Sequence, residues 1–166
     1  MIGGGPALED FVRVQRRLVH GIRSASPQAL GYRANPDGWP VWAIASHLTG
    51  TRIYWLCMVC GEPGVEKAHF VDAASLESWE DHLDRPRTAA EVVDALEISW
   101  GIVEDTLERW TPEMLEVEIQ VPRSGRSYSR RSILTRMVQH DAFHCGEIST
   151  LLAVNAGGSM DPWEPI

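Results

Sequence analysis

The sequence predicts an all-α protein, a four-helix bundle built as one domain over residues 1–166. Four long segments repeat apolar side chains every three or four residues, which is the period of a helix with one buried face. A chain of 166 residues can bury a core of its own, and no low-complexity tract or linker divides it. These two observations favour one bundle over several small units.

The predicted helices begin and end at recognisable signals. Pro40 suits the first turn of the second helix, and Gly61 ends it. Thr88 and Glu91 form a capping box at the start of the third helix. The four helices are expected at about residues 7–23, 40–60, 88–110 and 132–154, the last ending at Gly157-Gly158.

Two connections, residues 61–87 and 111–131, are longer than tight helical hairpins need, which argues against a simple up-down-up-down order. In the second connection Val117, Ile119 and Val121 alternate with polar residues. This alternation predicts a short β-hairpin that turns at Ser124-Gly125, with a plain loop as the alternative.

Composition excludes several classes of function. The net charge of −8, from 15 basic and 23 acidic residues, argues against nucleic acid as a partner. No apolar run is long enough to span a membrane. Three cysteines do not make a disulfide framework, and the N-terminal stretch lacks a secretory pattern. We therefore expect a cytoplasmic protein.

Candidate metal-binding residues lie in the last predicted helix, where "QHDAFHCGEIS" places His140 and His144 four residues apart. This spacing lets both imidazoles of one helical face reach a single metal ion, although ordinary core histidines held by hydrogen bonds are the alternative. His47, in the middle of the second helix, is the candidate third ligand. Tyr54 shares its face and is a candidate substrate-binding residue.

Glu147 lies one turn beyond His144 on the same face. Its carboxylate is a candidate catalytic group, which could orient a histidine ring, act as a general base or ligate the ion. A pair with an arginine of a neighbouring helix is the alternative. "HDAFH" is not interpreted as a zinc-protease motif, because Asp141 stands where that motif has glutamate. Cys57, Cys60 and Cys145 are expected to pack rather than to react.

The segments "WPVWAIASHLTG" and "HDAFHCGEI" resemble the DinB/YfiT-like superfamily, and the resemblance extends over essentially the whole chain. It implies an up-down-down-up four-helix bundle with one divalent metal ion, often zinc or nickel, held by His47, His140 and His144. It also implies a homodimer. This sequence departs from the family in having Cys145, Gly146 and Glu147 where arginine, glycine and glutamine are common.

Family members of known activity are largely transferases or isomerases that use bacillithiol, mycothiol or a similar low-molecular-weight thiol. The resemblance therefore implies a metal-dependent, thiol-dependent S-transferase or isomerase that acts on a small electrophile. Two alternatives stay open: a metal-dependent hydrolase with Glu147 as base, and a non-enzymatic, stress-related bundle that binds a metal or a small ligand.

Overall fold

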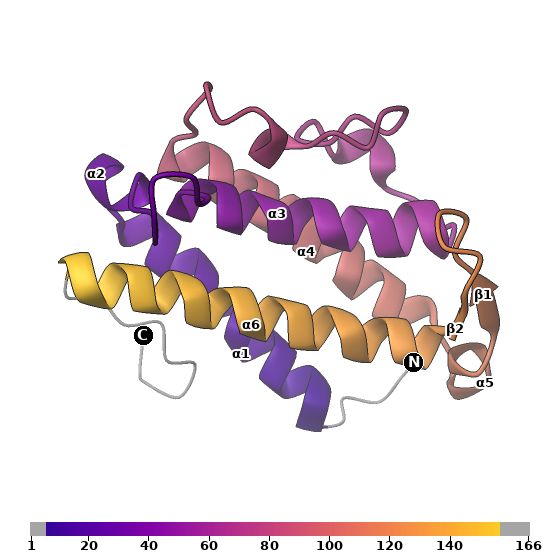
Figure 1. Cartoon of the computed structure of the whole chain (residues 1–166). Coiled ribbons are helices and arrows are strands. Elements are labelled where there is room, and N and C mark those ends of the chain that lie inside the picture. The colour runs from indigo at the N-terminus through magenta and orange to yellow at the C-terminus, as the bar shows by residue number, and fades with distance from the viewer. Residues whose placement is uncertain (1–5, 157–166) are drawn as a thin grey trace.

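Four long helices dominate the computed structural model, which describes residues 6–156 (Figure 1). The predicted helical class is confirmed. The predicted stop at Gly157-Gly158 lies outside the described residues. The long helices are α1 (Pro6–Ser24), α3 (Val41–Ile53), α4 (Ala89–Arg109) and α6 (Arg130–Ala156).

Shorter elements occupy the connections. The chain continues from α3 without a break into a π-helical segment, η1, in which the hydrogen bonds widen by one residue. The second predicted helix thus contains a change of geometry that its periodicity did not reveal. The short helices are α2 (Pro27–Leu30), η1 (Tyr54–Val59), η2 (Val65–Lys67), η3 (Trp79–Asp81) and α5 (Pro112–Leu115).

The long helices enclose one core. Helix α3 packs against α4 and α6, and α1 packs against the same two helices. In Figure 1, α3 and α6 lie side by side, with α4 behind α3. The predicted up-down-down-up order of helix directions stays a prediction. Among the described helices, none is long and apolar enough to cross a membrane.

Helix α4 shows how local sequence sets an element's position. The Glu91 amide donates to Thr88 Oγ1 at 3.3 Å, and the Thr88 amide donates back to Glu91 Oε2 at 2.9 Å. This is the predicted capping box, and it satisfies amides that the first helical turn leaves without partners. The apolar stripe of the helix is buried throughout, at Val93, Leu96, Trp100, Val103, Leu107 and Trp110.

The β-hairpin between α5 and α6 is confirmed. Strand β1 (Glu118–Gln120) pairs antiparallel with β2 (Ser127–Ser129), and Ile119 faces Tyr128 across the pair. Gly125 closes the turn with a φ of 66°, a left-handed conformation that glycine adopts without strain. The hairpin lies at the start of α6, beside the end of η1 (Figure 1).

A polar network crosses the middle of the bundle and centres on Arg52, whose side chain is 0% exposed. Its Nε and Nη2 atoms donate to Asp141 Oδ2 at 3.0 and 2.6 Å. The same guanidinium donates to Gln15 Oε1 at 2.8 Å and to Ser99 Oγ at 3.2 Å. Each of the four long helices contributes one residue, so this network ties all of them together.

We predict that Arg52→Met destabilises the fold by about 3–5 kcal/mol, because it leaves the buried Asp141 carboxylate without a counter-charge. Urea denaturation followed by circular dichroism measures the change. Arg23→Met is the matched control, because Arg23 pairs with Glu97 in an exposed ion pair. The control should cost at most about 1 kcal/mol. Equal effects of the two substitutions would contradict the importance of the buried pair.

Candidate metal centre

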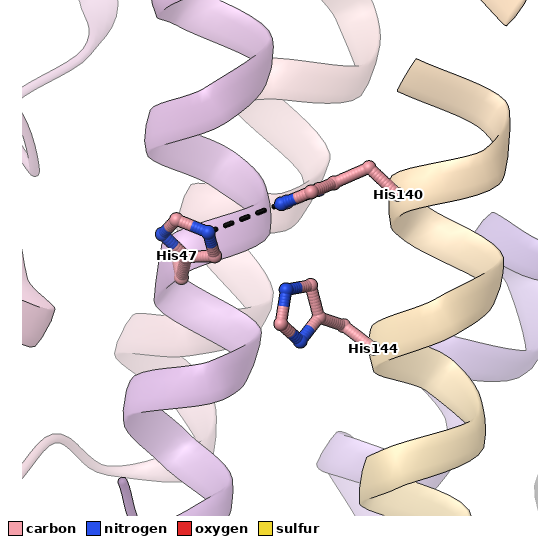
Figure 2. Close-up of side chains that lie close together, drawn as sticks. All are labelled: His47, His140 and His144. Atoms are coloured by element: carbon pink, nitrogen blue, oxygen red, sulfur yellow. Dashed lines mark hydrogen bonds between the residues drawn. The ribbon is translucent and has the colours of Figure 1, made fainter. Parts of the chain in front are cut away.

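Three histidines from two helices meet at one point. His47 comes from α3, and His140 and His144 come from α6. One ring nitrogen of each lies within 4.8 Å of the other two. Figure 2 shows the three rings pointing toward one another across the space between the helices. The structure thus brings together all three candidate metal ligands.

The closest approach within the cluster joins two ring nitrogens. His47 Nε2 lies 3.1 Å from His140 Nε2. Two unprotonated nitrogens at this distance repel each other unless a proton or a cation is shared between them. Nitrogens that share one tetrahedral zinc ion at about 2.0–2.1 Å lie roughly 3.3 Å apart. The observed spacing therefore suits a shared divalent cation.

Carboxylates hold the outer nitrogens of two of the rings. His47 Nδ1–H donates to Glu80 Oε1 at 3.1 Å, and His144 Nδ1–H donates to Glu147 Oε2 at 2.8 Å. These contacts place the proton on Nδ1 and leave Nε2 of each ring free to bind a metal ion. A carboxylate behind a histidine ligand is the usual arrangement in metal sites, where it fixes the orientation of the ring.

Glu147 therefore contacts the far side of His144. Within residues 6–156 no arginine pairs with it, and it does not belong to the group of side chains that can share an ion. Among the roles considered for this residue, orienting a histidine ring is the one that fits its contact.

Glu80 is a site residue that sequence analysis missed. It lies in η3, within the long connection, and its side chain is 6% exposed. The connection can approach α3 this closely because of Gly50, where an added Cβ would lie 3.0 Å from Ser78 Oγ and 3.5 Å from Glu80 Oε1. No periodic pattern marks Glu80. The Ser78–Asp81 capping box that starts η3 is the only local signal nearby.

The third ring has no such partner. His140 Nδ1 is buried and lies 3.8 Å from Asp141 Oδ1, and neither atom has a hydrogen-bond partner in the part of the chain that the structure describes. The other oxygen of Asp141 is engaged by Arg52. Because this carboxylate faces the bundle interior, Asp141 cannot play the part of the glutamate base in a zinc protease. The structure thus supports leaving that motif aside.

The histidines lie at the rim of the bundle rather than in its centre. Their side chains are 27% exposed for His47, 26% for His140 and 13% for His144. The sequence interpretation placed them on core-facing stripes. The helical angle gave their direction, but the Arg52–Asp141 pair takes the central position. Partial exposure keeps the cluster open to a ligand.

Burial lowers the pKa of His144, and the neighbouring rings of His140 and His47 lower it further, while the hydrogen bond to Glu147 acts in the opposite direction. A lowered pKa keeps the imidazole neutral at physiological pH, and a neutral imidazole is the form that binds metal ions. The electrostatics of the cluster therefore suit a metal site, and the set of three imidazoles fits zinc or nickel.

None of the three cysteines belongs to the cluster. Burial raises the pKa of Cys57 and of Cys60 to about 11, and that of Cys145 to about 12. All three are therefore protonated thiols at neutral pH, which suits packing and not nucleophilic or redox chemistry.

A pocket of about 400 Å³ opens beside the cluster, and His47 and His140 form part of its wall. This volume is within the range of small-molecule sites. Tyr54, the candidate substrate-binding residue, also lines it, as do Trp39 and Trp55. Tyr54 and Trp55 belong to η1, so the π-helical segment builds one side of the pocket.

Residues 10–148 match the sequence profile of the DinB superfamily. The chain belongs to this superfamily. The crystal structure of a DinB-like protein from Bacillus cereus ATCC 10987 is similar in fold, with a TM-score of 0.69, 17% sequence identity and 89% of each chain covered. No protein of curated function matches the chain. The comparisons thus establish the DinB family and its fold.

We predict that this DinB protein, purified without a polyhistidine tag, contains about one equivalent of zinc or nickel, and that His140→Ala loses it because two imidazoles remain. Elemental analysis of the purified proteins measures the content. His82→Ala is the control, because His82 is exposed and pairs with Glu77 outside the cluster. A wild-type protein that stays metal-free after incubation with divalent ions would contradict the site.

The contact between His144 and Glu147 can be tested without metal. In the metal-free protein, His144 should titrate below 6.5, and Glu147→Gln should lower the midpoint further because it removes a contact that favours the charged ring. Histidine proton NMR follows both midpoints. Between the lowered pKa of His144 in the folded protein and its unfolded value of 6.5, the unfolded chain binds more protons than the folded protein. The free energy of unfolding should therefore fall as the pH drops through this range. A midpoint that Glu147→Gln leaves unchanged would contradict the contact.

Proposed function

We propose that this protein is a metal-dependent S-transferase or isomerase that joins a low-molecular-weight thiol to a small electrophile, with one zinc or nickel ion held by His47, His140 and His144. One observation carries the proposal: three imidazole nitrogens lie within 4.8 Å of one another, and two of these rings, His47 and His140, line an open pocket. Three protein ligands leave a position of a four-coordinate ion for a further ligand, as catalytic sites do and closed structural sites do not.

A bound divalent ion would act as a Lewis acid and lower the pKa of a thiol, so that the reactive thiolate exists at neutral pH. In the transfer, the thiol sulfur forms a bond to the electrophilic carbon. The leaving group departs with its electron pair, and the thiol proton passes to solvent.

The chain's own residues support this chemistry by position. Glu80 and Glu147 hold two of the rings with Nε2 directed inward. All three cysteines are buried or half-buried, have raised pKa values and lie outside the cluster, so the nucleophilic sulfur must come from a separate molecule. This supports a thiol cosubstrate over a protein thiol.

Tyr54 and Trp39 are the side chains we assign to substrate binding. Both line the pocket, and the Trp39 ring lies 4.9 Å from the His47 ring. An indole and a phenol offer large contact surfaces to an apolar electrophile, and the Tyr54 hydroxyl can also donate or accept a hydrogen bond.

Hydrolysis remains the second candidate reaction. It would need Glu147 to act as a base on water, but the carboxylate is held at 2.8 Å by His144 and would have to leave that contact. The transfer reaction does not require Glu147 to leave its contact with His144. The cytoplasmic location and the homodimer stay proposals. The exposed Phe143 on α6, 69% exposed, supports an association of helix faces.

We expect the metal-loaded protein to accelerate the reaction of bacillithiol, mycothiol or glutathione with monochlorobimane, in which sulfur displaces chloride and a fluorescent adduct forms. His140→Ala should reduce the rate to the uncatalysed background, because the ion is lost. His82→Ala should retain the wild-type rate.

Other results of these assays would distinguish the transferase from the hydrolase and from a bundle without catalytic activity. A metal-loaded protein that consumes no thiol but cleaves p-nitrophenyl esters would overturn the transferase proposal in favour of hydrolysis. A metal-loaded protein inactive in both assays would leave a bundle that binds a metal or small ligand without catalysis.

A further inference from the structure

The pocket beside the histidine cluster differs in charge along its wall. Glu80 and Asp81 line it next to His47, whereas Arg123 and Arg136 line it on the side of the β-hairpin. The acidic pair is already engaged, since Glu80 accepts from His47 and Asp81 accepts from the Ser78 amide. The two arginines are therefore the charged groups in the wall that are available to a ligand.

Arg136 is held by contacts with aromatic rings, and among the described residues it donates no side-chain hydrogen bond. Its guanidinium carbon lies 5.6 Å from the centre of the Trp55 ring and 5.8 Å from that of Tyr128. Contacts with aromatic faces orient a guanidinium, yet they leave its N–H groups free for a carboxylate. Within residues 6–156, no carboxylate forms an ion pair with Arg136 or Arg123.

The position of Arg136 relates it directly to the cluster. It precedes His140 by four residues in α6, so the two side chains share a helical face and are separated by a rise of about 6 Å. Arg123 reaches the same pocket from the turn between β1 and β2. Tyr54, Trp55 and Met58 line the same pocket, and Trp55 contacts the Arg136 guanidinium.

We propose that this pocket binds a small organic carboxylate with an apolar or aromatic body, the carboxylate on Arg136 and Arg123 and the other end at the histidine cluster. The acidic residues beside His47 disfavour the reverse orientation. The aromatic side chains of the pocket wall, Tyr54 and Trp55, offer contact surface to the body of the ligand. A guanidinium suits the planar geometry of a carboxylate, which it can bind through two parallel hydrogen bonds.

This inference deepens the proposed function by naming the class of the electrophilic substrate, and it rests on that proposal for its catalytic meaning. The binding preference itself depends on the arginines and not on the metal. The two can therefore be tested separately on the same full-length protein, with and without the ion.

Isothermal titration of the metal-free protein with cinnamate and with its uncharged analogue cinnamamide tests the inference. We expect cinnamate to bind at least about tenfold more tightly, the effect of a charge-assisted, two-point contact. Arg136→Gln should abolish this preference, and Arg123→Gln should reduce it. Arg126→Gln is the matched control, because Arg126 lies in the same hairpin turn but does not line the pocket.

Equal affinity for the two compounds, no binding of either, or a preference that survives both Arg136→Gln and Arg123→Gln would overturn the inference. A preference present only in the metal-loaded protein would also overturn it, because the ion would then hold the carboxylate. That result leaves the proposed function standing. Conversely, a preference in a protein that never takes up metal would support the inference and overturn the proposed function.

Discussion

The buried ion pair between Arg52 and Asp141 is the constraint on which the rest of the structure depends. A guanidinium and a carboxylate that are both 0% exposed are costly to separate, because each would be left as an uncompensated charge in the core. Arg52 follows His47 on α3, and Asp141 is adjacent to His140 on α6. The pair therefore fixes the register of the two helices, and this register brings the imidazoles of His47 and His140 within 3.1 Å of each other. The same ion pair thus stabilises the core and sets the distance between His47 and His140.

The fold separates two kinds of polar group by depth. The central pair is enclosed and engaged with Gln15 and Ser99, so it has no surface to offer a ligand. The histidines keep partial exposure, and their outer nitrogens are held by carboxylates from different elements, Glu80 from the long connection and Glu147 from α6. A rigid interior with an oriented but accessible cluster is the combination that a metal-binding site with room for a substrate requires.

Sequence patterns predicted those features that local chemistry determines. The capping box at Thr88, the hairpin before α6 and the pair His140 and His144 follow from residue types at fixed spacings, and the structure contains each of them. His47 was predicted from its position in the middle of the second helix, and it lies beside that pair. Glu80 could not be predicted, because its contact with His47 depends on how a long connection folds back over Gly50. The partial exposure of the histidines could not be predicted either, since helical periodicity gives the direction of a side chain and not its distance from the centre of the bundle. Arg52 did carry a signal: it is the lone arginine in the apolar run from Val41 to Cys60, and a charge in such a run needs a buried partner.

The histidines of the candidate site and the residues that surround them come from different parts of the fold. The three clustered histidines stand on the two helices that the buried pair joins, whereas Glu80 comes from the connection after η1 and Arg123 from the hairpin turn. Connections tolerate changes in sequence more readily than packed helices do, so these walls can change without disturbing the spacing of the imidazoles. A bundle built in this way can keep one metal chemistry while its substrate changes. Under the proposed function, the choice of substrate would depend on Arg123 in the connection and on the helix positions that face it, such as Arg136 and Tyr54, rather than on the three histidines.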